Sequence, residues 1–132
     1  MKKLILSLSA ILMAFMMTSC GDPTSRVKSL TEDIEKNGND WTDEAQWDDA
    51  MVTIAEAIID FANSDPDEDA YEDFKDAVKD CYTAVDDIDD KKAKKARDKA
   101  ADKFDKNHKD LKKEMDKAEK ILRKLSKKFE DD

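Results

Sequence analysis

The chain is 132 residues long, carries 24 basic and 33 acidic side chains, and has a net charge of −9. With 43% charged residues, it approaches the composition at which too little apolar surface remains to offset the entropy of the unfolded chain. The length fits one modest domain, and the acidic balance argues against a nucleic-acid partner, which would require a basic surface.

The first twenty residues, MKKLILSLSAILMAFMMTSC, have the order of a secretory signal. Lys2 and Lys3 precede an apolar stretch from Leu4 to Met17, and small residues then lead to Cys20. The apolar stretch is shorter than the roughly 20 residues of a membrane-spanning helix. We therefore expect residues 1–19 to be a cleaved signal peptide.

The tetrapeptide MTSC, residues 17–20, resembles the lipobox of bacterial lipoproteins, although Met17 stands where leucine is usual. In that family the cysteine thiol receives a diacylglyceryl group and the preceding segment is removed. The resemblance implies that Cys20 is lipidated, becomes the first residue of the mature protein, and anchors it to a membrane. An ordinary signal peptide followed by a chance cysteine is the alternative.

Residues 20–40 are expected to form a lipidated N-terminus, a short helix and a linker. Val27, Leu30 and Ile34 have helical spacing, and the NGND sequence at residues 37–40 is a stop signal. The remaining residues, 41–132, are expected to form a helical bundle domain.

The spacing of apolar residues predicts a helix within residues 41–64, with Thr42 as its expected N-cap. Its apolar positions step by four and three residues, the spacing of one side of a helix: Trp47, Met51, Ile54, Ile58 and Phe61.

The next helix is expected to begin at Pro66, with Asp65 as its N-cap and Glu68 completing a capping box. Its apolar face is Tyr71, Phe74, Val78, Cys81, Val85 and Ile88. Because lipidation of Cys20 would leave Cys81 without a disulfide partner, we expect Cys81 to act as a small buried apolar residue.

The same helix start also resembles an EF-hand calcium loop. Five carboxylates occupy positions 1, 3, 5, 9 and 12 of a twelve-residue segment: Asp65, Asp67, Asp69, Asp73 and Asp76. Ala70 stands where glycine permits the sharp turn, and Asp76 stands where the longer glutamate is usual. A helix start is the favoured interpretation, a calcium site is the alternative, and no other metal or cofactor is expected.

The apolar spacing continues to the end of the chain, through Phe104, His108, Leu111, Met115, Ala118, Leu122, Leu125 and Phe129. Acidic residues between 86 and 90 favour a helix N-terminus and predict a turn near residues 86–91. The ion pairs available between Asp87 and Lys91, and between Asp90 and Lys94, favour instead one helix over residues 66–130. We favour the turn, and hence an all-α, small antiparallel bundle of three main helices, the last one long, plus a short N-terminal helix.

The charges are distributed unevenly along the chain. Residues 20–90 carry 5 basic and 23 acidic side chains, whereas residues 91–132 carry 17 basic and 10 acidic ones. The basic segment either balances the acidic helices within the molecule, which is the favoured interpretation, or binds anionic lipid head groups or glycan through Lys91 to Lys128.

No motif for catalysis stands out. The one histidine, His108, falls on the apolar stripe and is expected to be packed there rather than to act as a ligand or base. An enzyme with an unrecognised carboxylate site remains an alternative.

The layout resembles that of short helical lipoproteins of unknown function from Bacteroidota, most locally in WTDEAQW at residues 41–47. That resemblance implies an outer-membrane location, on either the periplasmic or the surface side. The expected function is a non-enzymatic interaction or structural module with a protein partner in the cell envelope. Binding of an anionic ligand through the basic segment is the alternative.

Overall fold

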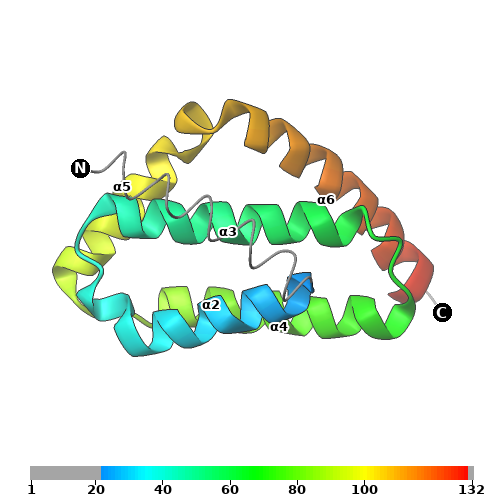
Figure 1. Cartoon of the computed structure of the whole chain (residues 1–132), viewed down its shortest axis with the longest axis horizontal. Coiled ribbons are helices and arrows are strands. Elements are labelled where there is room, and N and C mark those ends of the chain that lie inside the picture. The colour runs from blue at the N-terminus through cyan, green and yellow to red at the C-terminus, as the bar shows by residue number, and fades with distance from the viewer. Residues whose placement is uncertain (1–21, 131–132) are drawn as a thin grey trace.

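The computed structural model describes residues 22–130, and the expected signal peptide and Cys20 lie outside them. The described residues form five α-helices and one 3₁₀ turn: α2 (Pro23–Asn37), η1 (Gly38–Asp40), α3 (Glu44–Ala62), α4 (Glu68–Asp86), α5 (Lys91–Asn107) and α6 (Lys109–Glu130). There is no strand between residues 22 and 130, so the predicted all-α helical bundle is confirmed (Figure 1).

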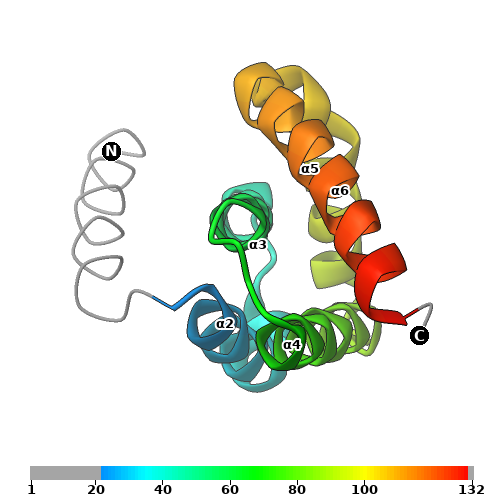
Figure 2. The ribbon, with the colours of Figure 1, turned by 90° about the vertical axis from the view of Figure 1, so that its right-hand side faces the viewer.

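Helix α3 is the centre of the bundle. It packs against α2, α5 and α6, and α2 packs in turn against α4. Figure 2 shows α2 and α4 side by side on one side of α3, with the α5–α6 hairpin leaning against its other side. The packing of α2 against both α3 and α4 makes this helix part of the bundle rather than a linker preceding it.

The core contains the apolar faces that helical spacing predicts. Its buried residues include Val27 and Ile34 of α2, Trp47, Ile54, Ile58 and Phe61 of α3, Tyr71, Phe74 and Cys81 of α4, and Ile88 of the turn that follows α4. The rings of Phe61 and Phe74 stack with centroids 4.1 Å apart, which joins α3 to α4. Burial of these apolar side chains is the main source of stability in a chain with so many charges.

Helix α5 packs through alanines. Ala93, Ala96 and Ala100 are all buried, and their spacing of three and four residues puts them on one face. Because the side chains are small, the backbones of α5 and α3 can approach closely. The apolar stripe predicted from the sequence for the last third of the chain begins at Phe104, so it does not include these three alanines.

Two predicted N-caps are wrong. The cap of α3 is Asp43, which forms a capping box with Gln46, and not Thr42. The cap of α4 is Asp67, whose carboxylate accepts a hydrogen bond of 2.8 Å from the backbone N–H of Ala70. Asp65 has a φ of 53°, in the left-handed region, where it reverses the chain after α3 and lacks the extended conformation of a cap.

The predicted turn between α4 and α5 is confirmed. Asp90 caps α5 by accepting a hydrogen bond of 2.9 Å from the N–H of Ala93. Asn39 supports the turn from η1, because its Oδ1 accepts from the backbone N–H groups of Asp89 and Asp90 at 2.9 and 3.1 Å. The NGND sequence therefore stops α2 and also holds a turn fifty residues further along the chain.

The expected long last helix is wrong, because the segment after the turn is divided at His108. This residue has φ −132° and ψ 57°, which ends α5 and lets α6 run back across α3 (Figure 1). The hydrogen bonds between the His108 side chain and Asp48 of α3 hold the break in place.

Candidate functional site

The five aspartates of the possible calcium loop do not surround a common point. Asp69, Asp73 and Asp76 lie along the regular helix α4, and the carboxylate of Asp67 caps that helix. An EF-hand loop wraps its oxygen ligands around the ion, which a straight helix cannot do. Across residues 22–130, no group of three histidine, cysteine, aspartate or glutamate side chains is placed to hold a metal ion.

His108 joins the α5–α6 break to the central helix. Its Nε2 lies 2.8 and 3.0 Å from the two carboxylate oxygens of Asp48, and its ring centroid lies 5.0 Å from that of Phe104. The pKa of the neighbouring Asp49 carboxyl is raised, mainly because the group is partly buried. The charge of Asp48 raises this pKa further, and His108 lowers it. The predicted packed position of His108 is confirmed, and its contact with Asp48 gives it a structural partner.

Cys81 is fully buried among the core residues of α4. Burial raises the pKa of its thiol, and a hydrogen bond with Thr31 of α2 partly opposes that shift. A buried thiol with a raised pKa is a poor nucleophile, so the predicted role as a small core residue is confirmed.

The outer surface of α6 is strongly basic. Six exposed lysines step along it by three or four residues, on the side opposite the apolar stripe that leans on α3. We call these residues the cationic face: Lys109, Lys113, Lys117, Lys120, Lys124 and Lys127. Exposed Arg123 and Lys128 flank it.

Few of these cations pair with the acidic helices. Among the described residues, one salt bridge joins a lysine of α5 or α6 to a carboxylate of another helix, from Lys103 to Glu44 at 2.9 Å. Lys112 and Lys117 pair with acidic residues of α6 itself. Direct pairing therefore accounts for little of the basic segment, and most of the cationic face points into solvent.

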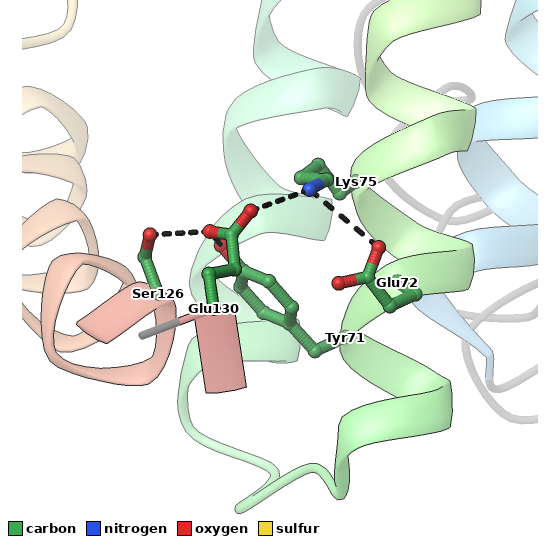
Figure 3. A network of polar contacts seen from close by, with 5 residues as sticks. All are labelled: Tyr71, Glu72, Lys75, Ser126 and Glu130. Atoms are coloured by element: carbon green, nitrogen blue, oxygen red, sulfur yellow. Dashed lines mark hydrogen bonds and ion pairs between the residues drawn. The ribbon is translucent and has the colours of Figure 1, made fainter. Parts of the chain in front are cut away.

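A polar cluster fastens the end of α6 to the start of α4 (Figure 3). The Glu130 carboxylate accepts hydrogen bonds from Lys75 at 2.7 Å, from Tyr71 at 3.1 Å, and from Ser126. These bonds, that of Lys75 foremost, lower the pKa of Glu130 to about 2. Glu72 lies 3.5 Å from the same Lys75 ammonium. Sequence reasoning missed this cluster because it joins residues more than fifty positions apart.

A groove of about 480 Å³ lies between α2 and α4. Its floor is small or apolar and includes Ile34, Ala77 and Ala84, whereas its walls carry the carboxylates of Glu32, Glu35, Asp80 and Asp87. Lys28 is the one cation among its lining residues. A second pocket of about 150 Å³ lies between α3, α4 and α6 and is mostly apolar.

No protein-family model, no curated protein and no solved structure matches this chain. Within residues 22–130, no helix combines the length and apolar composition needed to cross a bilayer.

Proposed function

We propose that the protein is a non-enzymatic interaction module, anchored in the outer membrane of the cell envelope through a lipid on Cys20. The observation that carries the proposal is the position of α2. This helix begins at Pro23 with Asp22 as its cap, so only two residues separate Cys20 from the bundle. At roughly 3.5 Å per residue, such a link spans about 10 Å. A lipid on Cys20 would therefore hold the bundle directly against the bilayer surface.

The contacts at this end of the bundle indicate what would lie near the bilayer. Arg26 of α2 pairs with Asp60 of α3 at 2.6 Å, so the end of α3 lies beside the beginning of α2. The cluster around Glu130 brings the end of α6 to the beginning of α4. The opposite end, with η1 and the turn before α5, would project away from the membrane and be accessible to a protein partner (Figure 1).

Metabolic labelling with an alkyne fatty acid tests the anchor. The wild type should be labelled and sediment with membranes, whereas Cys20→Ser should be unlabelled and released, because a serine hydroxyl cannot form the thioether. Cys81→Ala is the matched control, since it removes the other cysteine and should leave labelling intact. Equal labelling of the wild type and Cys20→Ser would overturn the proposal.

A second candidate function, binding of an anionic lipid head group or glycan, is supported by the exposure of the cationic face. Each lysine near an anionic membrane surface adds about 1 kcal/mol to binding. We expect the triple variant Lys120→Glu, Lys124→Glu, Lys127→Glu to lose most binding to phosphatidylglycerol vesicles. Retained binding would reject this second function and leave the lipid anchor untouched.

A further inference from the structure

The groove between α2 and α4 and the cationic face of α6 are complementary surfaces of one molecule. We infer that the groove of one copy binds the cationic face of a second copy, so that the chains associate head to tail. This inference concerns the folded bundle and does not depend on the lipid anchor.

The groove has an unbalanced negative charge. Glu32 and Glu35 stand on its α2 wall, and Asp80 and Asp87 stand on its α4 wall. All four are exposed, and none of them takes part in the ion pairs of residues 22–130. With Lys28 as the one cation in the lining, these carboxylates repel one another. A row of lysines would relieve that repulsion.

The floor of the groove suits the lysine side chains as well as their charges. Ile34, Ala77 and Ala84 present small or apolar surface at its base. Lysine carries a long apolar stem below its ammonium group, so the stem can lie on such a floor while the ammonium reaches the carboxylates.

The two surfaces also match in length. The groove follows α4 from Ala77 to the C-cap residue Asp87, a rise of about 15 Å at 1.5 Å per residue. The cationic face from Lys117 to Lys127 covers about 15 Å by the same measure. One helix can therefore align its lysines with the whole groove.

The fold prevents the cationic face of α6 from reaching the groove of the same molecule. Helix α6 turns its apolar stripe toward α3, so its cationic face points outward. Figure 2 shows α2 and α6 on opposite sides of the bundle. Each copy thus offers a free groove on one side and a free cationic face on the other, which is the arrangement of a heterologous, repeating interface.

Two charge-reversed variants test the interface. The groove variant carries Glu32→Lys, Glu35→Lys and Asp80→Lys, and the face variant carries Lys120→Glu, Lys124→Glu and Lys127→Glu. All six positions are exposed and outside the ion pairs of the described residues, so circular dichroism should show both variants folded. A third variant, Lys94→Glu, Lys95→Glu, Lys99→Glu on α5, matches the face variant in charge but not in location.

Association is measured by fluorescence cross-correlation of the full chain in non-ionic detergent, with micelles in large excess over protein. The wild type should associate, and rising salt should weaken the association. The groove and face variants should each lose it by at least tenfold, the α5 variant should keep it, and an equal mixture of the groove and face variants should regain it.

Three results would overturn the inference: a wild type that does not associate, an α5 variant that loses association as fully as the face variant, or a mixture that stays unassociated. If the mixture fails while the face variant also loses binding to phosphatidylglycerol vesicles, the cationic face belongs to an anionic ligand instead of a second copy.

Discussion

Gly38 occupies a position in the core where there is too little space for a Cβ atom. A Cβ at this position would lie 3.1 Å from Cγ2 of Ile88 and 3.2 Å from Cγ2 of Ile34. Both contacts are with β-branched side chains in the core, which have little freedom to move. The φ of −55° is ordinary, so lack of space is the constraint, not the backbone conformation.

We therefore predict that Gly38→Ala lowers the free energy of unfolding by about 1–3 kcal/mol, the usual cost of overpacking a core. Chemical denaturation measures it, with Ser29→Ala at an exposed position of α2 as the control. A Gly38→Ala protein as stable as the control would mean that the contact between η1 and Ile88 is looser than described.

Glu130 makes the attachment of α6 sensitive to pH. Its pKa is about 2 in the folded chain and about 4.5 without the hydrogen bonds from Lys75, Ser126 and Tyr71. Because folding lowers this pKa, the carboxylate stabilises the folded state fully above pH 4.5, and that stabilisation is lost as the pH falls toward 2.

The stability difference between the wild type and Glu130→Gln should therefore shrink over this acidic range, as followed by denaturation at each pH. Glu114→Gln is the control, since the ion pair of Glu114 with Lys117 lies within α6. A difference that stays constant with pH would contradict the cluster in Figure 3.

At the scale of elements, the break between α5 and α6 depends on a contact with α3. His108 and Asp48 are each about three-quarters buried, with side-chain exposures of 26% and 28%. Partial burial makes their interaction stronger than that of a fully exposed pair.

A double-mutant cycle with His108→Ala and Asp48→Ala should give a coupling energy of about 0.5–1 kcal/mol. The exposed pair of Lys112 and Asp116 within α6 provides the comparison and should couple less. Additive effects of the two substitutions would show that His108 does not hold the hairpin to the central helix.

The elements also show what helical spacing can and cannot predict. The faces of α3 and α4 were predictable because large apolar residues recur there every three or four positions. The alanine face of α5 was not, since alanine is common on buried and exposed sides of helices alike. The break at His108 was hidden because the apolar stripe runs through it without glycine or proline. The caps were missed because several aspartates compete at each helix start.

Sites formed by residues from different helices could not be predicted from the sequence alone. The groove requires α2 and α4 to be neighbours, and the Glu130 cluster requires α6 to return to the start of α4. The basic character of the last third was plain from composition, but its concentration on the solvent side of α6 follows only once the apolar stripe is known to face α3.

At the scale of the whole molecule, opposite charges are displayed on different sides of one bundle. The acidic groove lies between α2 and α4, and the cationic face lies on α6. A lipid on Cys20 would confine neighbouring copies to one membrane surface, where they would meet at high local concentration.

Mass spectrometry of the protein purified from membranes gives the sharpest test of the proposed lipid on Cys20. We predict a mature chain that begins at Cys20, with the mass of a diacylglyceryl group on its N-terminal peptide, while the peptide containing Cys81 is unmodified. An N-terminal peptide that retains residues 1–19, or one that begins at Cys20 without lipid, would contradict the proposed anchor.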